Sequence, residues 1–399
     1  MRYRAISTAQ VAGKILLIRV DLNVPMKDGH ISDDTRLRRL VPGLKYLIGQ
    51  GGKLVLLSHF GRPKGAVIPE MSLAPIAPAL SALLGQEIGF CPAWRGREAQ
   101  DCIAHLKDGQ VLLLENMRFD AGEEGNDPRL AAELAQLGEL YVNDAFSAAH
   151  RAHASTAGLA QHLPSYAGAL MEQELLALET ALSKPKRPLL AVVGGAKVST
   201  KFDLLSNLCT KVDCLVIGGG MANTFLLAQG YDVGTSLCEP DLAEQAALVL
   251  KRAATHSCQV ILPSDAQIAP TLDQGAKAQN VAIETVPAGH MILDFGPQST
   301  ARVLEALKEA ATLIWNGPLG AFEFKPFNAA TQALAKAVAA QTKAGALVSI
   351  AGGGDTVAAL TQAGVSNDLS YISTAGGAFL EWMEGRTLPG VAALGSVGI

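Results

Sequence analysis

The chain has 399 residues, of which 49% are hydrophobic and 18% charged, and its formal net charge is −4. That length exceeds one ordinary hydrophobic core and favours two domains of roughly 150 to 200 residues each. The acidic balance excludes a general attraction to nucleic acid or to an anionic membrane, because such binding relies on dense Lys and Arg patches. The amino-terminal MRYRAISTAQ has no apolar signal core, and no run approaches the roughly 18 apolar residues of a membrane span. The six cysteines show no C-x-x-C or metal-binding spacing, so we expect reduced thiols and a cytoplasmic protein.

Short apolar runs alternate with longer helix-like stretches along the whole chain. The runs are, in chain order, ILLIRVDLNV, KLVLLSH, QVLLLEN, ELYVND, PLLAVVGG, DCLVIGGG, QVILPSD, TLIWNG and ALVSIAGGG. Near-continuous apolar strands in this alternation predict parallel sheets that helices cover on both faces. Ligands of such sheets bind beyond the carboxyl ends of the strands, so the residues after each run carry the functional information.

The boundary between the two halves is predicted between Leu170 and Pro188. Met171, Leu175 and Leu178 recur at helical spacing, and SKPKRP then ends the helix before the next strand. We expect an amino-terminal domain over residues 1–170, a connecting helix or hinge over 171–187, and a carboxyl-terminal domain over 188–378.

The strand ends of the first half are rich in arginine. In RVDLNVP, Arg19, Asp21 and Asn23 alternate with apolar residues, so the three share one face of a predicted strand that Pro25 ends. Arginine suits phosphate and carboxylate because its planar guanidinium donates two parallel hydrogen bonds. One such residue in a loop is more often a surface residue, but several strand ends at one edge favour a pocket for a small, multiply charged anion. The other candidates are Arg36, His59, Arg62, Arg118, His150, Arg151 and His153.

The strand ends of the second half are rich in glycine and include two lysines. VVGGAKVSTK places Lys197 and Lys201 four residues apart, on one helix face if a helix begins there. They form a candidate clamp for a triphosphate. Two solvated lysines would show the same pattern, and this alternative applies more to Lys201. The segment does not match G-x-x-x-x-G-K-[ST], so a P-loop is not supported.

The stretch ALVSIAGGGDTVAA predicts a short buried strand, a turn of Gly352, Gly353 and Gly354, and a helix that opens at Asp355 and Thr356. Free N–H groups at a helix start suit phosphate oxygens. Asp355 is then a candidate ligand for the Mg²⁺ that such a phosphate carries. An ordinary glycine turn with Asp355 as the helix cap is equally compatible.

Three further strand ends in the second half have possible nucleotide contacts. The glycines of CLVIGGGMANTF either let a flat base approach the backbone or only pack a helix against the sheet. Glu323 of IWNGPLGAFE is either a partner for ribose hydroxyls or a surface residue. The glycines of STAGGAFLE offer a second set of convergent N–H groups. LPSDAQIA is interpreted as scaffolding without chemistry. The candidate residues are Gly219, Gly220, Asn316, Glu323, Gly376 and Gly377.

The sequence resembles the phosphoglycerate kinase family along essentially its whole length. The motifs that match in the family's order are RVDLNVP, SHFGRP, LLLENMRF, DAFSAAHRAHAS, GGAKVSTK, GGGMANTFL, LPSDAQIA, WNGPLGAFE, GGGDT and STAGGAFLE. The resemblance implies an α/β fold of two Rossmann-like three-layer (αβα) domains with mainly parallel sheets, joined by a helix, with the active site in the interdomain cleft. It implies that the amino-terminal domain binds phosphoglycerate, that the carboxyl-terminal domain binds the nucleotide, and that residues 379–399 return to the amino-terminal domain.

The resemblance also implies a role for each matched residue. The phosphoglycerate site is expected at Asp21, Asn23, Arg36, His59, Arg62, Arg118 and Arg151. Nucleotide contacts are expected at Lys201, Gly219, Gly220, Asn316, Glu323, Gly353, Gly354, Asp355 and Thr356, with Asp355 as the carboxylate for Mg²⁺. Arg36, Lys197 and the amides near Gly376 and Gly377 are expected to meet the phosphoryl group in transit.

The implied reaction is the reversible, Mg-dependent transfer of the acyl phosphate of 1,3-bisphosphoglycerate to ADP, which gives 3-phosphoglycerate and ATP in glycolysis. Such a transfer needs alignment and charge neutralisation rather than a protein nucleophile. The resemblance further implies a monomer without a nucleic-acid or membrane partner. The sequence departs from the family pattern at Ser147-Ala148, where the family often has Gly-Thr, and at Ala375, where it often has Gly.

Two other classes of protein share the two-domain α/β pattern. A nicotinamide-dependent dehydrogenase would have a G-x-G-x-x-G turn after its first strand, and the chain has none there. A two-lobed solute-binding protein would be exported, and we expect no export signal here. Stabilisation by Mg·ADP rather than NAD, together with turnover, would distinguish the kinase from both.

Overall fold

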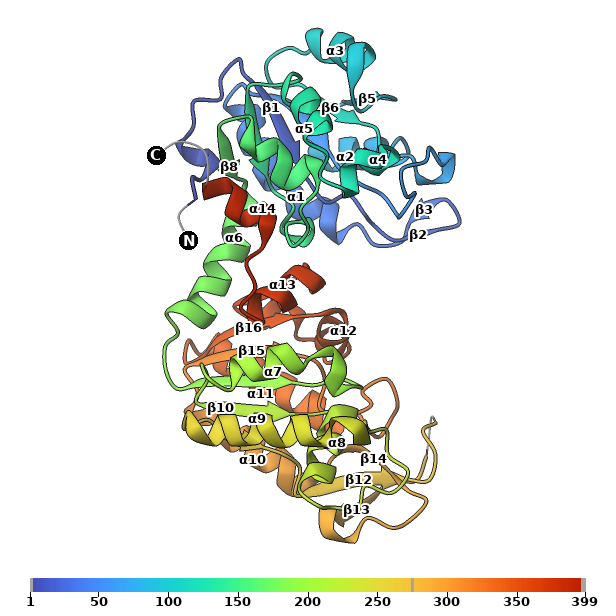
Figure 1. Cartoon of the computed structure of the whole chain (residues 1–399), viewed down its shortest axis with the longest axis vertical. Helices are drawn as coiled ribbons and strands as arrows, with labels where there is room; N and C mark the ends of the chain where they lie inside the picture. The colour runs from blue at the N-terminus through green and yellow to red at the C-terminus, as the bar shows by residue number, and fades with distance from the viewer. Residues whose placement is uncertain (1–2, 274–275, 396–399) are drawn as a thin grey trace. The chain divides into compact units, whose positions relative to one another are not determined.

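The computed structural model describes residues 3–273 and 276–395 of the chain. They form two compact units: unit 1 is Met1–Leu175 with Thr387–Ile399, and unit 2 is Leu176–Arg386. Each unit has its own parallel sheet, whose strands are drawn as arrows in Figure 1. Each unit also has its own hydrophobic core. Both sheets carry helices between successive strands, as the alternation of apolar runs predicts.

The sheet of unit 1 has six parallel strands in the order β5-β6-β4-β1-β7-β8. The strands are β1 (Ile15–Arg19), β4 (Lys53–Leu57), β5 (Ile88–Cys91), β6 (Val111–Leu114), β7 (Leu140–Asn143) and β8 (Ser165–Ala167). Leu54, Val55, Leu56 and Leu57 are all fully buried. Consecutive residues of a strand point to opposite faces, so both faces of this sheet are covered, which explains the continuous apolar runs.

The first strand is shorter than the sequence predicts. We expected it to continue to Pro25, but β1 ends at Arg19. Beyond this point side chains take over from the sheet ladder: Leu22 N donates to Ser58 Oγ at 2.9 Å, and Asn23 N donates to Asp21 Oδ1 at 3.0 Å. An aspartate that accepts from the residue two positions on forms a local turn that competes with strand pairing.

The sheet of unit 2 also has six parallel strands, in the order β11-β10-β9-β15-β16-β17. The strands are β9 (Leu189–Val193), β10 (Cys214–Ile217), β11 (Gln259–Ile261), β15 (Thr312–Asn316), β16 (Val348–Gly352) and β17 (Tyr371–Ser373). Trp315 in the central strand β15 is fully buried. The prediction of two domains with parallel sheets is confirmed.

Two antiparallel elements were not predicted. A three-stranded sheet in unit 2 has the order β13-β12-β14, and a two-stranded hairpin in unit 1 pairs β2 with β3. Their bounds are β2 (Met26–Lys27), β3 (His30–Ile31), β12 (Asp265–Ala269), β13 (Gln279–Ala282) and β14 (Met291–Phe295). The segment LPSDAQIA therefore supplies the middle strand of this second sheet rather than only the end of β11.

The helices connect successive strands. In unit 1 they are α1 (Thr35–Gly49), α2 (Ile76–Leu84), α3 (Gly96–Ala104), α4 (Ala121–Glu124), α5 (Pro128–Ala135) and α14 (Pro389–Ala392). In unit 2 they are α7 (Phe202–Leu208), α8 (Gly220–Ala228), α9 (Ala243–Thr255), α10 (Pro297–Glu309), α11 (Ala329–Lys343), α12 (Gly354–Gln362) and α13 (Gly376–Met383). Across the described ranges, no helix is long and apolar enough to cross a membrane.

The chain passes from one unit to the other within α6 (Ala169–Leu178) and again after Arg386. The boundary predicted at residue 379 would divide α13, whose Phe379 and Met383 are fully buried. Past the helix, Arg386 still pairs with Asp203 of α7 at 2.9 Å. Because α13 and this ion pair belong to unit 2, the return to unit 1 begins at Thr387 rather than at residue 379. The last four residues of the predicted returning segment, 396–399, lie outside the described residues.

Candidate active site

The basic residues predicted in the first half follow four neighbouring strands of the unit 1 sheet, β6, β4, β1 and β7. Arg36 of α1 reaches back to the segment after β1, where its Nη1 donates to Asp21 Oδ2 at 2.9 Å and to the Asn23 carbonyl at 2.8 Å. Asn23 Oδ1 in turn accepts from Gly61 N at 3.0 Å, and Arg118 Nη1 donates to the Gly61 carbonyl at 2.8 Å. The segments after β1, β4 and β6 are thus joined by side chains that the sequence analysis singled out.

The first departure from the family pattern lies against this cluster. Ser147 is in the short helix η4 (Phe146–Ala148), which follows β7, and its hydroxyl donates to Asp21 Oδ2. The same carboxylate oxygen accepts from Arg36. Ser147 therefore adds a hydrogen bond to the Asp21–Arg36 pair. Sequence reasoning marked this position as unusual but did not place it in the site.

Arg62 and Arg151 differ from the other arginines because both are exposed. Arg62 makes no hydrogen bond or ion pair to any described residue. Arg151 Nε lies 3.2 Å from His150 Nε2. By contrast Arg118 is buried, and its Nε is 3.1 Å from Glu124 Oε1. The cluster therefore contains buried arginines and exposed ones, and an arginine such as Arg62 that makes no hydrogen bond to a described residue keeps its donors for a ligand.

The sequence analysis assigned no separate role to Arg19, which the structure buries beside the cluster. Arg19 is completely buried at the end of β1, and its guanidinium contacts His59 and Ser155. Ser155 also donates from its hydroxyl to Glu123 Oε1 at 2.6 Å. The signal in the sequence was the alternation of Arg19 with Asp21 and Asn23, which placed Arg19 on the same side of the chain but gave no reason for its burial.

The two buried histidines of this region do not carry charge. His59 is 8% exposed, and burial together with the neighbouring Arg19 and Arg118 holds its pKa well below the ordinary value. Burial and the same two arginines lower the pKa of His153 to about 3. At neutral pH the buried part of the cluster therefore takes its positive charge from arginine and not from His59 or His153.

In unit 2, Lys201 is the best-anchored of the predicted residues. Its ammonium donates to the carbonyls of Gly194 and Asn316 and to Asn316 Oδ1, the last at 2.6 Å. These bonds join the carboxyl ends of β9 and β15. Burial lowers the pKa of Lys201 to about 8, while Asp355 acts in the opposite direction. The interpretation of Lys201 as a solvated lysine was wrong.

Lys197 differs from Lys201 in its surroundings. It precedes the short helix η8 (Val198–Thr200), and Lys201 is the cap residue before the separate helix α7, so the two lysines do not share one helix face as predicted. The backbone at Lys197 is extended, with φ −134° and ψ 134°, which is the physical reason that no helix begins there. Its side chain is exposed and makes no hydrogen bond or ion pair within the described parts of the chain. All three protons of the Lys201 ammonium are used by the protein, whereas those of Lys197 are available.

The glycine turn after β16 forms the start of α12. Gly353 precedes the helix at φ +97°, and a Cβ there would lie 2.8 Å from Asn316 Nδ2. Only glycine suits this position, because the backbone is in a conformation that side chains disfavour and the neighbouring amide leaves no space. Gly354 and Asp355 are exposed in the first turn of the helix, where backbone N–H groups have no intrahelical acceptor.

The side chains of Thr356 and Asp355 have different surroundings. Thr356 is buried, donates to the Gly352 carbonyl at 2.9 Å and accepts from Gly317 N at 2.7 Å. Its hydroxyl therefore connects the ends of β16 and β15. Asp355 does not cap α12, since Gly353 holds the cap position and no side chain bonds there. The interpretation of Asp355 as the helix cap is thus excluded.

The glycines after β10 are required by backbone packing. A Cβ on Gly219 would lie 2.5 Å from the Gly195 carbonyl oxygen, and one on Gly220 would lie 2.8 Å from the Ala196 carbonyl oxygen. These close approaches bring the end of β10 against the end of β9. Packing alone is enough to explain both glycines, which favours the structural alternative over direct contact with a base.

The remaining predicted residues lie at the ends of β15 and β17. Asn316 is buried and donates to the Gly352 carbonyl at 2.8 Å, while Glu323 is exposed in the loop that follows. Gly376 and Gly377 open α13, and a Cβ on Gly376 would meet nothing within 4 Å. Ala375, the second departure, precedes the helix at φ −95°, a conformation that alanine adopts without strain.

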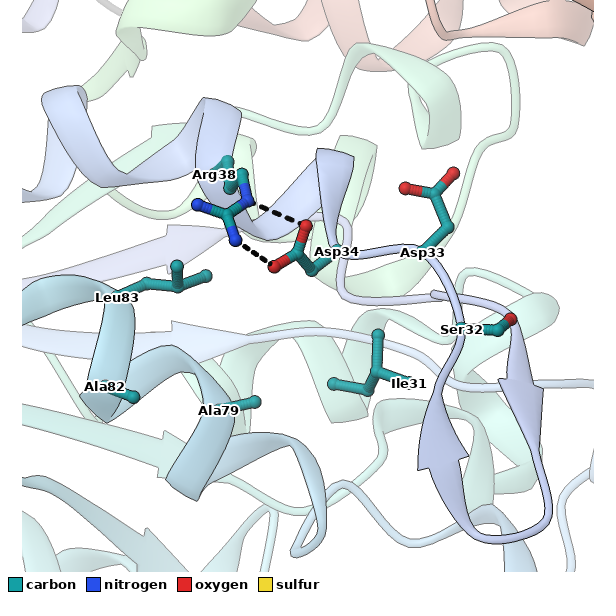
Figure 2. A pocket seen from close by; sticks show the side chains of 8 residues that line it. All are labelled: Ile31, Ser32, Asp33, Asp34, Arg38, Ala79, Ala82 and Leu83. Carbon is teal, nitrogen blue, oxygen red and sulfur yellow. Dashed lines mark hydrogen bonds and ion pairs between the residues drawn. The ribbon is translucent and has the colours of Figure 1, made fainter.

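One hollow of unit 1 lies apart from the predicted residues. It has a volume of about 610 Å³ and is bordered by β3, the start of α1 and α2 (Figure 2). Arg38 lies over it with its guanidinium 2.7 Å from Asp34, which neutralises its charge. Because none of the anion-binding candidates lines it, this hollow does not favour the binding of a phosphate compound.

Metal-binding side chains do not cluster in the described part of the chain. Among residues 3–273 and 276–395, no three His, Cys, Asp or Glu side chains form a group that could hold a metal ion. A metal that is bound mainly by phosphate oxygens needs only one or two carboxylates from the protein. Asp355, exposed at the start of α12, is such a carboxylate.

Comparisons with known proteins agree on one family. The family model described as phosphoglycerate kinase matches residues 6–386. Two similar relatives are the phosphoglycerate kinases of Sinorhizobium fredii, 59% identical with 96% of each chain covered, and of Ruegeria sp., 58% identical with 99% of this chain and 100% of the other covered. The solved structure of phosphoglycerate kinase from Coxiella burnetii is 43% identical, covers 98% of this chain and 99% of its own, and superimposes with a TM-score of 0.93.

Proposed function

The chain belongs to the phosphoglycerate kinase family, and on that premise we propose which of its residues carry the reaction. The protein is a phosphotransferase with a carboxyl group as acceptor: it interconverts 1,3-bisphosphoglycerate and 3-phosphoglycerate with ADP and ATP in glycolysis. The attacking and leaving oxygens belong to a phosphate and a carboxylate. Neither needs a protein nucleophile or a strong base, so catalysis depends on alignment and on neutralising charge.

We place phosphoglycerate at the arginine cluster of unit 1. Arg36 and Arg118 are held by their protein contacts, so they present charge in a fixed position. Arg62 and Arg151 are exposed and supply adaptable guanidinium groups for the phosphate of the ligand. Asp21 and Asn23 hold Arg36 through their carboxylate and carbonyl oxygens, and His59 supplies a donor at the floor of the cluster.

We place the nucleotide at the strand ends of unit 2. The first-turn N–H groups of α12 at Gly354 and Asp355 suit phosphate oxygens. Lys201 adds positive charge near them, since its ammonium and the Asp355 carboxylate interact. Glu323 is exposed in the loop beyond β15 and is proposed as the partner of the ribose hydroxyls. Asn316, Thr356, Gly219 and Gly220 shape this site through their backbone and side-chain contacts rather than by direct binding.

The residues present fit a magnesium ion that arrives with the nucleotide. Asp355 is exposed at the start of α12, and its carboxylate makes no ion pair with any described residue. An exposed carboxylate beside phosphate-binding amides is the donor set that Mg²⁺ takes in nucleotide sites. Asp355 would hold the ion, which would supply charge neutralisation, and the amides of α12 would orient the phosphate oxygens.

Lys197, Arg36 and the first amides of α13 are proposed to meet the transferring phosphoryl group. Lys197 is exposed, and its ammonium makes no hydrogen bond or ion pair within the described residues, although its charge helps to lower the pKa of Glu239. Its charge is therefore free to follow the phosphoryl group, which a fully bonded lysine such as Lys201 cannot do. Gly376 and Gly377 at the start of α13 offer N–H groups that have no intrahelical acceptor.

One observation carries this assignment: two sets of anion-binding groups of different chemistry lie at the carboxyl strand ends of the two sheets, arginines in unit 1 and amides with lysine in unit 2. We would test it with a coupled assay of the purified protein with 3-phosphoglycerate, ATP and Mg²⁺, in which a dehydrogenase consumes the 1,3-bisphosphoglycerate. We expect activity that chelation of Mg²⁺ abolishes.

The matched variant for this assay is Lys197→Ala. Its kcat is expected to fall by about two to four orders of magnitude, since an interaction made with the phosphoryl group in transit is lost. Its affinity for Mg·ADP should change far less. An unchanged kcat would remove Lys197 from the mechanism, and a selective loss of Mg·ADP affinity would place it with the nucleotide instead.

We further propose that the enzyme acts in the cytoplasm as a monomer. All six cysteines are free thiols, which suits a reducing compartment. The net charge of −4 gives no electrostatic reason for binding nucleic acid or an anionic membrane. Light scattering of the purified chain would test the monomer.

A further inference from the structure

Arg19 is buried beneath the proposed phosphoglycerate site, and each part of its guanidinium has a different partner. Nε donates to Ser155 Oγ at 2.9 Å, Nη1 donates to the Val20 carbonyl, and Nη2 lies 3.0 Å from His59 Nδ1. The side chain has no exposed surface, so it does not reach a ligand itself. Its hydrogen bond to His59 links it to a residue of the proposed site.

The contact between Arg19 and His59 determines which nitrogen of the imidazole carries the proton. A guanidinium has five N–H donors, no acceptor, and does not lose its proton in proteins. Nδ1 of His59 must therefore accept this hydrogen bond, because a proton there would set two donors against each other. The remaining proton of the neutral ring is then on Nε2.

We propose that Arg19 is a positioning residue that holds His59 as the neutral tautomer protonated at Nε2, so that His59 presents an N–H donor, and not a cation, to an oxygen of the phosphoglycerate. Only the identity of the ligand rests on the proposed function. Nε2 has no partner among the described residues and is not enclosed by them. It is therefore the ring nitrogen that a ligand can approach.

Three cations and one histidine act on His59, and the cations oppose its protonation. They are Arg19 at the end of β1, Arg118 in the short helix η3 (Met117–Phe119), Arg36 in α1, and His153 before the short helix η5 (Ala154–Gly158). Three of the four are permanent cations. The fourth is neutral, because burial and the same arginines lower the pKa of His153 to about 3. Burial of His59 acts in the same direction as these charges, and the pKa of His59 lies well below its ordinary value.

A buried carboxylate keeps Arg19 in this orientation. Glu123 is fully buried and accepts from Ser155 twice, from the backbone N at 2.9 Å and from the hydroxyl at 2.6 Å. The hydroxyl proton of Ser155 is used in this bond, so towards Arg19 Nε the hydroxyl oxygen acts as an acceptor. The hydrogen bonds from Arg19 through Ser155 to Glu123 orient the guanidinium and place a carboxylate on the side away from His59. The Nη2 donor is thereby aimed at Nδ1.

The first test is NMR spectroscopy of the full-length, ligand-free protein labelled with ¹⁵N-histidine. The ring nitrogens of His59 are assigned by their loss in the His59→Gln variant. We expect an unprotonated Nδ1 and a protonated Nε2 at every pH from about 5 to about 8. A proton on Nδ1, or conversion to the cation within this range, would overturn the proposal. The tautomer is measured without substrate, so an inactive protein in the coupled assay would contradict the proposed function and not this result.

The second test compares two amides in place of the imidazole. The amide nitrogen of Gln at position 59 comes close to the place of Nε2, whereas that of Asn comes close to Nδ1. If the ligand takes its hydrogen bond from Nε2, the KM for 3-phosphoglycerate of His59→Asn should exceed that of His59→Gln by about tenfold or more, with similar kcat values. Equal KM values would show that no donor is needed at the Nε2 position.

The third test removes the positioning residue. In Arg19→Gln the permanent donor to Nδ1 is lost, so the pKa of His59 is expected to rise and its Nδ1–H tautomer to become detectable in the NMR experiment, against the remaining effect of burial. The KM for 3-phosphoglycerate should then acquire a pH dependence that the unchanged protein lacks. A folded Arg19→Gln protein in which His59 stays neutral and protonated at Nε2 would assign the effect to burial instead. If this variant does not fold, the first two tests decide the proposal.

Discussion

Burial separates the charged side chains of the two proposed ligand sites into those that the protein holds and those that it leaves free. Arg118 and Lys201 use their donors on backbone carbonyls, whereas Arg62 and Lys197 are exposed. A held cation provides a fixed electrostatic field, and a free one provides hydrogen bonds to the ligand. Two residues of the same type in one site are therefore expected to respond differently to substitution.

Arg62 is predicted to act on phosphoglycerate binding alone. It has no hydrogen bond or ion pair to a described residue, so Arg62→Ala removes ligand contacts without disturbing the fold. We expect the KM for 3-phosphoglycerate to rise about 10-fold to 100-fold, because charge-assisted hydrogen bonds contribute about 1.5–3 kcal/mol. The KM for ATP should stay unchanged in steady-state assays.

The matched control for this prediction is Arg97→Ala. Arg97 in α3 is also exposed, and its nearest carboxylate, Asp101, is 3.8 Å away. Its removal should leave both KM values unchanged, since exposed ion pairs contribute little. A selective rise in the KM for ATP in Arg62→Ala would overturn the assignment of phosphoglycerate to unit 1.

Lys201 predicts a pH dependence for nucleotide binding. Burial lowers the pKa of its ammonium to about 8, so the free protein loses this charge as the pH rises through about 8. The affinity for a polyphosphate should then fall, with Kd rising by up to about tenfold per pH unit above that value. Isothermal titration with Mg·ADP between about pH 7 and about pH 9.5 measures the effect.

Lys201→Met supplies the comparison. It cannot titrate, so its Kd for Mg·ADP should be weaker at neutral pH and should show no change in slope near pH 8. A flat Kd in the unchanged protein across the same range would show that the charge of Lys201 does not contribute to nucleotide binding.

At the scale of helices and strands, three aspartates from the ends or edges of strands accept from the first N–H groups of neighbouring helices. Asp144 accepts from Leu170 N and Met171 N of α6, and two further aspartates do the same for α10 and α11. A glycine lies directly against the carboxyl group of each of these aspartates, and a Cβ on that glycine would clash with the carboxyl group. The carboxylates and glycines are Asp144 with Gly168, Asp265 with Gly296, and Asp294 with Gly320.

These contacts give a structural reason for motif residues to which the sequence analysis assigned no chemistry. The aspartate of LPSDAQIA is Asp265, whose Oδ1 accepts from Ser299 N at 2.7 Å at the start of α10. A carboxylate at a helix amino terminus satisfies unpaired N–H groups and interacts favourably with the helix dipole. The starts of α6, α10 and α11 are thus fixed by residues far away in the sequence.

Asp144 provides a prediction at this scale. Burial raises its pKa to about 6, against the effect of the two N–H donors. The folded protein then binds more protons at this site than the unfolded chain between about pH 4 and about pH 6. Stability therefore falls as the pH rises through this interval, by up to about 3 kcal/mol for a shift of this size.

The test replaces Asp144 by Asn and by Ala. Both N–H groups bond to Oδ1, an atom that Asn keeps, so Asp144→Asn should retain the contact and lose the fall in melting temperature between about pH 4 and about pH 6. Asp144→Ala leaves two donors without an acceptor and should cost about 1–3 kcal/mol at every pH. Identical pH profiles of the Asn variant and the unchanged protein would contradict the titration of Asp144.

At the scale of the whole molecule, the two units differ in how the chain builds them. Unit 2 is one continuous segment, whereas unit 1 needs residues from both ends of the chain. The returning segment forms α14, which contacts η5 and η4 in unit 1. Gly390 N donates to the Ala149 carbonyl at 2.8 Å, and a Cβ on Gly390 would lie 2.9 Å from Ala149 Cα. Unit 1 is therefore complete only when the end of the chain is in place.

Gly390→Val is predicted to affect the two ligands unequally. The added side chain pushes α14 away from Ala149, which belongs to the segment that carries Ser147 and Arg151. We expect weaker binding of 3-phosphoglycerate, by about fivefold or more for a steric cost of about 1–3 kcal/mol. Binding of Mg·ADP to unit 2 should be unchanged in calorimetric titrations. Equal weakening of both ligands would show that the defect spreads beyond unit 1.

Much of this architecture follows from the sequence alone. The alternation of apolar runs with helical stretches determines two parallel sheets, because strands buried on both faces must be continuously apolar. The motifs at the strand ends determine the chemical class of the ligands, since arginines, lysines and glycine amides bind anions wherever the chain places them. The order of the motifs along the chain was sufficient to indicate the family.

Other features depended on contacts between distant segments. Local spacing placed Lys197 and Lys201 on one helix face and left open whether Lys201 is solvated, but the fold packs Lys201 against Asn316 and leaves Lys197 exposed. The antiparallel sheet around β12, the end of β1 at Arg19 and the return of the chain at Thr387 were also not readable from local patterns. Burial, protonation and hydrogen-bond partners are set by residues far apart in the sequence. For that reason, only the tertiary structure decided that Arg19 is buried against His59 and which ring nitrogen remains for the ligand.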